Sequence, residues 1–246
     1  MGVAGAITIE LAGETATLLP QRALFWAAES TLFVADLHLG KDGCFRAAGA
    51  PVPAGVLDET LTRLDTVVEA TGAERVVVLG DLTHAPIGLT DDMVDEVAAW
   101  RRRSAFDFAL VDGNHDRKLR ASGLADLARA WSMNLIDPGS RFGPFVLQHE
   151  PDIVDEAHAL AGHLHPAVIV RGGGDAVKTP AFHVLNGPGD AGVTILPAFS
   201  SFVAGVPVRP EPDDGVWAVT PERVIELKTP ASPSPRPRGR ARSPAR

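Results

Sequence analysis

The sequence is poor in the features that mark secreted and membrane proteins. It has a single cysteine, Cys44, among 246 residues, which excludes an internal disulfide framework and a zinc ribbon built from cysteines. The N-terminal segment MGVAGAITIE lacks the charged start and long apolar core of a secretory signal, and no apolar run approaches the roughly 18 residues of a membrane span. We therefore expect a cytoplasmic protein that does not associate with membranes.

Positive charge is also scarce, except at one end. The formal net charge of −8 argues against a basic protein that coats nucleic acid. Residues 228–246 carry Lys228 and five arginines without an acid, so this segment is +6 and residues 1–227 are −14. The segment is rich in proline and serine and has no apolar period, so we expect one domain at 1–227 followed by a disordered basic tail. The tail is either an electrostatic arm for nucleic acid or only a solubilising terminus.

The body alternates strands and helices in its first half and is almost all strand in its second half. In the first half, strands are expected at 6–11, 15–19, 23–28, 31–35, 75–80, 107–113 and 144–148, and helices at about 54–70, 91–103 and 119–130. In the second half, strands are expected at 167–170, 181–185, 193–196, 216–219 and 223–227. This order predicts an α/β protein in which two sheets pack together with helices outside.

Five short polar motifs each follow a predicted strand or, for the last of them, the short apolar run AHALA. They read Asp-Leu-His at 36–38, Gly-Asp at 80–81, Gly-Asn-His-Asp at 113–116, His at 149 and Gly-His-Leu-His at 162–165. Sites in α/β sheets form at the carboxyl ends of strands, so we expect these side chains to converge. Asp, Asn and His supply the oxygen and nitrogen donors that manganese, iron and zinc accept.

The ligands are too numerous for one ion, which predicts a two-metal site. Residues two apart point to the same side of an extended chain, so Asp36 and His38 can reach one ion, and His163 and His165 share this spacing. Asp81 is suited to bridge the two ions. Two divalent ions would lower the pKa of bound water toward about 7 and would hold both the attacking and the leaving oxygen of a phosphate ester.

In this order the five motifs resemble the signature of the calcineurin-like metallophosphoesterases. The resemblance implies a four-layer αββα sandwich of the α/β (α+β) class, in which helices flank two mixed sheets. It also implies a dinuclear metal site. The implied ligands are Asp36, His38, Asp81 and His165 for the first ion, and Asp81, Asn114, His149 and His163 for the second. His115 would contact the phosphate and act as general acid, with Asp116 orienting it.

Three segments narrow the resemblance further. ADLHLGK at 35–41, GDLTH at 80–84 and LPAF at 196–199 are similar to the bacterial ligase-associated DNA damage response metallophosphoesterases. That similarity implies a DNA endonuclease or phosphodiesterase in DNA repair, working with an ATP-dependent DNA ligase and a helicase. We expect manganese as the metal, with iron, zinc or magnesium as alternatives. The expected substrate-binding residues are Asn114, His115 and His84, of which His84 either lines the pocket beside the metals or lies on a surface loop.

Two other functions fit the same residues. The first is a phosphatase or phosphodiesterase acting on a small nucleotide or metabolite, because a compact site without a capping region does not exclude small substrates. The second is a non-catalytic scaffold for a repair partner, although degenerate members of this kind lose ligand histidines and this chain retains every expected ligand. The DNA assignment rests mainly on the resemblance, and the charge of −14 on the body opposes tight non-specific binding to DNA.

Overall fold

The structure is a computed structural model that describes residues 2–119, 123–172, 175–187 and 191–228. It has the predicted α/β fold, with two mixed β-sheets and four α-helices. The expected disordered tail lies outside the described residues, apart from Lys228. None of the helices in the described ranges combines the length and the apolar content that a membrane crossing requires.

The first sheet has seven strands, arranged in the order in which they occur in the chain. Strands β1 to β4 pair antiparallel, and β4 to β7 pair parallel. The strands are β1 (Ile7–Leu11), β2 (Glu14–Leu19), β3 (Ala23–Trp26), β4 (Thr31–Val34), β5 (Arg75–Leu79), β6 (Asp107–Val111) and β7 (Met133–Ile136). The parallel strands β4, β5 and β6 are nearly continuous runs of buried apolar residues, as expected for strands that are covered on both faces.

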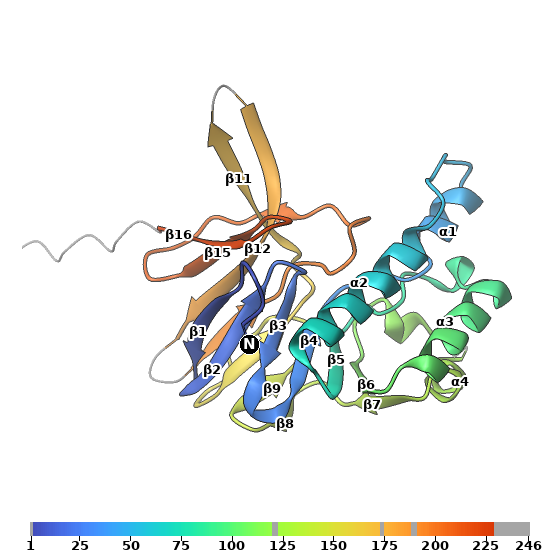
Figure 1. Ribbon diagram of the computed structural model, residues 1–246, viewed down its shortest axis with the longest axis horizontal. Coiled ribbons are helices and arrows are strands. Elements are labelled where there is room, and N and C mark those ends of the chain that lie inside the picture. Colours follow the sequence, from blue (N-terminus) through green and yellow to red (C-terminus); the bar gives the residue numbers. More distant parts are fainter. Residues whose placement is uncertain (1, 120–122, 173–174, 188–190, 229–246) are drawn as a thin grey trace, which may run out of the picture.

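The second sheet is built from the second half of the chain. Its main order is β14-β11-β12-β13-β10-β9-β8, with β15 pairing with β12 and β16 with β15. The strands are β8 (Ser140–Phe142), β9 (Phe145–Leu147), β10 (His158–Ala161), β11 (Pro166–Gly172), β12 (Asp175–Asn186), β13 (Gly192–Ile195), β14 (Val206–Pro207), β15 (Gly215–Val219) and β16 (Val224–Leu227). Strands β9, β10 and β13 are parallel neighbours. The far end of the β11–β12 hairpin stands clear of the rest of the molecule (Figure 1).

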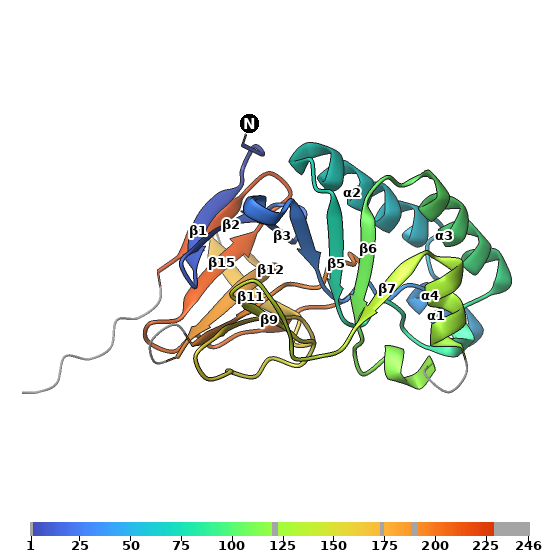
Figure 2. The same ribbon diagram turned by 90° about the horizontal axis from the view of Figure 1, so that it is seen from below.

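The four α-helices of the described residues all precede β7 in the chain. They are α1 (Lys41–Ala47), α2 (Val56–Thr71), α3 (Asp91–Arg103) and α4 (Leu124–Ala130), and three short 3-10 helices are η1 (Ala27–Glu29), η2 (Pro86–Gly88) and η3 (Asp116–Leu119). The α-helices lie together on the side of the first sheet that faces away from the second sheet (Figures 1 and 2). The described residues place no α-helix on the outer face of the second sheet. Residues 148–157, which connect the parallel strands β9 and β10, contain no helix. A small apolar cluster on β9, β10 and β13 packs there against Val154.

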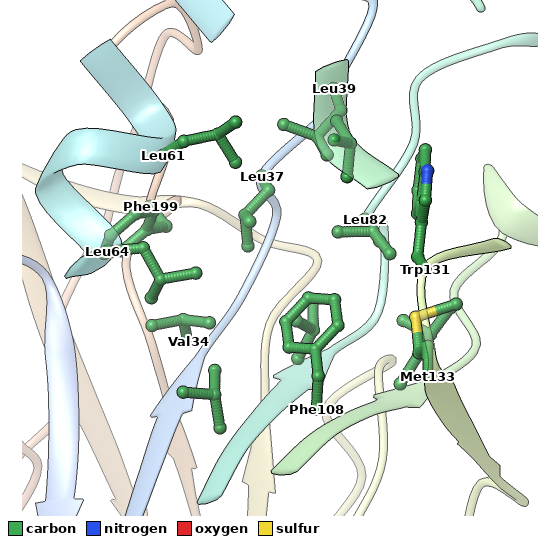
Figure 3. Packing of buried hydrophobic residues seen from close by; sticks show 14 of the residues in the cluster. Val34, Leu37, Leu39, Leu61, Leu64, Leu82, Phe108, Trp131, Met133 and Phe199 are labelled. Carbon is green, nitrogen blue, oxygen red and sulfur yellow. The ribbon is translucent and has the colours of Figure 1, made fainter. Parts of the chain in front are cut away.

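Two larger apolar clusters hold these layers together. On the helix side of the first sheet, Val34 of β4 and its neighbours pack against Leu64 of α2 (Figure 3). On the other side, Phe33 of β4 packs in a cluster with Phe145 and Leu160 of the second sheet. Because neighbouring residues of a strand point to opposite faces, alternate residues of β4 serve the two clusters.

The helix expected at 91–103 has the predicted ends, and the Thr90 hydroxyl accepts from the main-chain N–H of Met93 at 3.3 Å. The helix expected at 119–130 instead divides into η3 and α4, with 120–122 outside the described residues. The sequence did not predict α1, which has seven residues and contains Gly43, nor the strands β7, β8, β10 and β14, which have two to four residues each. Elements this short carry too little periodicity to be recognised.

Candidate metal centre

Each of the five motifs follows a strand, and for four of them the strand was predicted from the sequence. In the first sheet, the parallel neighbours β4, β5 and β6 lead to Asp36, Asp81 and Asn114. In the second sheet, the parallel neighbours β9 and β10 lead to His149 and His163. The main-chain N–H of His163 donates to the Asp36 carboxylate at 3.0 Å, and the His149 ring lies 3.4 Å from Asp81 Oδ1. The packing of the sheets therefore brings the five strand ends to one place.

Asp36, His38 and His165 form the first cluster of ligand atoms. Asp36 Oδ1 lies 3.2 Å from His165 Nε2, and the Nε2 atoms of His38 and His165 lie 3.3 Å apart. Ligand atoms of all three residues fall within 4.8 Å of one another. Asp36 and His38 come from the first sheet and His165 from the second, so this cluster exists only where the two sheets meet.

Asn114, His149 and His163 form the second cluster. His149 Nε2 lies 3.0 Å from Asn114 Oδ1 and 3.1 Å from His163 Nδ1, which is itself 3.1 Å from Asn114 Oδ1. Asp81 lies between the clusters, with Oδ1 facing His149 at 3.4 Å and Oδ2 facing His38 at 3.8 Å. Its two carboxylate oxygens thus face different clusters, which is the arrangement that a bridging ligand needs.

The spacing within each cluster fits divalent metal ions. Ligand atoms about 2.1 Å from an ion are separated by about 3.0 Å in octahedral and about 3.4 Å in tetrahedral coordination. The pairs within the clusters lie 3.0–3.3 Å apart. Two imidazole nitrogens at this distance share at most one proton, so several lone pairs face each cluster without a donor. The donor set and its spacing therefore fit a pair of divalent ions.

The ligand positions have an unusual backbone conformation. Positive φ angles of 56°, 48°, 51°, 70° and 46° occur at Asp36, His38, Asp81, His163 and His165. A left-handed conformation costs a residue with a side chain roughly 1–2 kcal/mol, and such residues gather at functional sites. The surrounding packing therefore holds these ligands in a conformation that their own backbone disfavours.

The route by which Asp36 and His38 converge differs from the prediction. We expected an extended chain, but both residues are left-handed. Leu37 and Leu39 still alternate with them and point into the apolar cluster on the helix side (Figure 3). The burial of these two leucines directs Asp36 and His38 toward the centre.

The protonation states of His38 and Asp81 suit metal binding. Burial lowers the pKa of His38 to about 2, despite the charge of Asp81 beside it. Burial would raise the pKa of Asp81, but the hydrogen bond and the charge of His149 outweigh burial and hold that pKa at about 2. Burial acts to lower the pKa of His149, but Asp81 raises it above its ordinary value. At neutral pH His38 is therefore a neutral donor and Asp81 an ionised one, which are the forms that coordinate metals.

His84 and His115 lie together beside the first cluster. Their rings stack with centroids 4.7 Å apart, and His84 Nδ1 lies 3.3 Å from Nδ1 of His38. The His115 side chain is 23% exposed, and its Nε2 lies 3.8 Å from Asp81 Oδ2. Burial lowers the pKa of His84 to about 4, with the charges of His115 and Lys41 acting in the same direction. His84 therefore lies beside the first cluster and not on a remote surface loop.

Asp116 has a different place from the one we expected. Its carboxylate accepts hydrogen bonds from the main-chain N–H groups of Leu82, Thr83 and Gly113 at 3.2, 2.9 and 3.0 Å, and from the Thr83 hydroxyl at 2.9 Å. The atom that faces Nδ1 of His115 is the main-chain carbonyl oxygen of His84. Asp116 therefore joins the Gly-Asp and Gly-Asn-His-Asp loops, and the His84 carbonyl holds the ring in place of Asp116.

Sequence reasoning missed these supporting groups because most of them are main-chain atoms. The Leu79 carbonyl accepts from Nδ1 of His149 at 3.0 Å, as the His84 carbonyl does from His115. Main-chain groups have no residue-type signal in a sequence. Thr83 is the one side chain among them, and its place directly after the Gly-Asp-Leu segment was its only signal.

The fold and the clustered Asp, Asn and His side chains define a metal-dependent hydrolase of phosphate esters. The chain belongs to the calcineurin-like phosphoesterase family, whose family model matches residues 30–177.

Among solved structures, the chain is similar to the nuclease MPE of Pseudomonas putida, with a TM-score of 0.75 and 30% identity over 90% of this chain and 100% of that chain. It is also similar to Yfce, a phosphoesterase from E. coli, at a TM-score of 0.42 and 14% identity over 80% of this chain and 97% of that chain. No curated protein matches the chain significantly.

Proposed function

We propose that this protein is a metal-dependent phosphodiesterase that cuts DNA internally during DNA repair. The observation that carries the proposal is the complete set of Asp, Asn and His side chains at the ends of five strands. Similarity to a nuclease over 90% of the chain supports a nucleic acid as substrate. An ATP-dependent DNA ligase and a helicase are the proposed partners, and copurification with them from cells tests this part separately.

We assign two divalent ions to the two clusters, with manganese as the first choice. The proposed ligands are Asp36, His38, Asp81 and His165 for one ion, and Asp81, Asn114, His149 and His163 for the other. When bound, such ions activate water and neutralise the charge of a phosphodiester.

His115 is the proposed general acid and, with Asn114 and His84, a substrate-binding residue. It is more exposed than His38 or His149, so a substrate can reach it. A carbonyl oxygen can only accept, so the contact with His84 places the proton of neutral His115 on Nδ1 and leaves Nε2 toward the centre. A second proton taken up at Nε2 would then be available to the leaving oxygen of the substrate.

Charge near this histidine pair also supports an anionic substrate. Besides burial and the charge of His115, the charges of Lys41 and Lys118 act to lower the pKa of His84, so both cations act electrostatically on this histidine. Two divalent ions and the two ligand carboxylates would together leave the centre at about +2. An acidic protein can therefore present a locally positive pocket to a phosphate group.

A substrate panel with Mn²⁺ tests the proposal. The substrates are circular single-stranded DNA, duplex DNA, a chromogenic phosphate bis-ester and a chromogenic mono-ester. We expect the circle to be opened, the bis-ester to be cleaved, and His115→Ala to lower both rates by about 10² to 10⁴ while manganese stays bound. His183→Gln is the matched control, because His183 pairs with Asp214 at 2.9 Å, outside the five motifs.

Two other results would replace the proposal. Rapid turnover of the mono-ester or of a small nucleotide, with every DNA form intact, would identify a small-molecule phosphatase. Metal binding without hydrolysis of any substrate, together with normal cellular function of His115→Ala, would identify a scaffold.

A further inference from the structure

Residues 196–201, which we term the bridging segment, contain the LPAF motif that the proposed function leaves unused. The segment follows β13 and crosses from the second sheet to the first. The main-chain N–H of Leu196 donates to the Ala161 carbonyl at 2.8 Å, and that of Phe199 donates to the Ala35 carbonyl at 2.8 Å. Ala161 directly precedes the Gly-His-Leu-His motif, and Ala35 directly precedes the Asp-Leu-His motif. The bridging segment therefore joins the points where ligands of the two sheets leave their strands.

Two arginines fasten the bridging segment. Arg22, in the turn between β2 and β3, donates from Nη1 to the carbonyls of Ser200 at 2.9 Å and Ala198 at 3.4 Å. Arg63 of α2 lies over the Phe199 ring, with Cζ 4.6 Å from the ring centroid. Phe199 is fully buried and lies beside Leu64 of α2 (Figure 3). Arg22 thus holds the main chain of the segment, while Arg63 and the apolar cluster hold its aromatic ring.

The arginines are costly groups to keep at this position. Burial lowers the pKa of Arg22 to about 10, and the charge of Arg63 acts in the same direction. Arg22 also has a left-handed backbone, with a φ angle of 64°. Arg22 is a partly buried charge, and burying a charge is weak evidence of a gain in stability. The contacts of Arg22 are therefore better explained by the position in which they hold the bridging segment.

We propose that Arg22 and Arg63 are positioning residues of the metal centre. The first ligand cluster takes Asp36 from the first sheet and His165 from the second, so its geometry depends on how the two sheets are spaced at this end. By fixing the bridging segment, the arginines set that spacing. The inference rests on the proposed metal centre but not on the proposed substrate.

Manganese affinity, measured by calorimetry on metal-stripped protein, tests the inference. Loss of groups that orient metal ligands lowers metal affinity by about 10- to 100-fold, so we expect Arg22→Met to weaken manganese binding at least tenfold. Arg22→Lys retains one donor for the Ser200 carbonyl and should restore part of the affinity. Hydrogen exchange at residues 35–38 and 162–165 should accelerate in Arg22→Met before metal is added. Arg63→Met removes the contact with the ring and the ion pair with Glu59 at 3.9 Å, and it covers the case in which Arg22→Met does not fold.

Arg101→Met is the matched control. Arg101 also donates to two carbonyls, those of Trp131 at 3.1 Å and Phe106 at 3.0 Å, but on the helix side of the first sheet. It should lower the Tm while leaving manganese affinity unchanged. The inference is overturned if Arg22→Met binds manganese as tightly as the wild type. If Arg22→Met does not fold, the same result in Arg63→Met overturns it. An equal loss of manganese affinity in Arg101→Met would also overturn it. Normal metal binding by the wild type without DNA cleavage would defeat the proposed function and leave this inference standing.

Discussion

Replacing Asp116 with alanine should destabilise the protein before any metal is added. The carboxylate is fully buried and accepts four hydrogen bonds, three from main-chain N–H groups and one from the Thr83 hydroxyl. A hydrogen bond contributes about 1 kcal/mol net, so the loss of all four should lower the free energy of unfolding by about 4 kcal/mol. In a protein of this size, 1 kcal/mol shifts the Tm by about 2–4 °C, which predicts a decrease of roughly 8–16 °C.

Urea and thermal unfolding in the presence of EDTA measure this effect. Asp116→Asn should lower the free energy of unfolding by about half as much. Its amide NH₂ group replaces one of the two carboxylate oxygens, and this group cannot accept hydrogen bonds from the main-chain N–H groups that it faces. Thr83→Val removes one of the four bonds and should cost about 1 kcal/mol. If Asp116→Ala unfolds like the wild type and loses only turnover, Asp116 acts on His115, and the loop-joining role derived from the structure is refuted.

Three further predictions concern Gly80, His158 and the basic tail. A methyl group at Gly80 would collide with the His149 ring, so Gly80→Ala should lower both the stability of the protein and its manganese affinity. Gly13 has a similar φ but open space around it. Gly13→Ala should therefore lower the free energy of unfolding by only about 1 kcal/mol and leave manganese binding intact. Burial lowers the pKa of His158 from 6.5 to about 4, so the unfolded chain takes up a proton that the folded protein resists. As the pH falls from about 6.5 to about 4, this group should remove up to about 3 kcal/mol of stability, and unfolding curves of His158→Gln should lack that loss. A chain that stops after Lys228 lacks five arginines and should bind DNA more weakly, with a shallower dependence on salt; unchanged affinity would identify the tail as a solubilising terminus.

The convergence of the proposed ligands could be predicted from the sequence because two independent signals coincide in the motifs. Each motif combines metal-binding side chains with an apolar run that marks a strand, and parallel strands carry their ends to the same edge of a sheet. The same logic predicted β4, β5 and β6 and the α/β class. The single domain at 1–227 stays a prediction.

Other features could not be read from the sequence because they arise from tertiary packing. The left-handed backbone of Asp36 and His38 depends on packing on both faces of the first sheet, and the residue types do not indicate this conformation. The hydrogen bonds of the Asp116 carboxylate depend on which main-chain donors lie nearby. Strand β10 is too short to show a period, although its end carries two proposed ligands.

The division of the ligands between the two sheets also has a consequence during synthesis. Asp36, Asp81 and Asn114 precede β7, whereas the last proposed ligand, His165, directly precedes β11. A ribosome that has released only the first sheet has therefore exposed carboxylate and amide oxygens but lacks three of the four proposed imidazole ligands. Neither proposed ion can acquire its full ligand set until the strands β9 and β10 have emerged and packed. Metal capture should thus be a late event in the life of the nascent chain, and a fragment ending at β7 should bind manganese weakly until a separate fragment with the remaining strands is added.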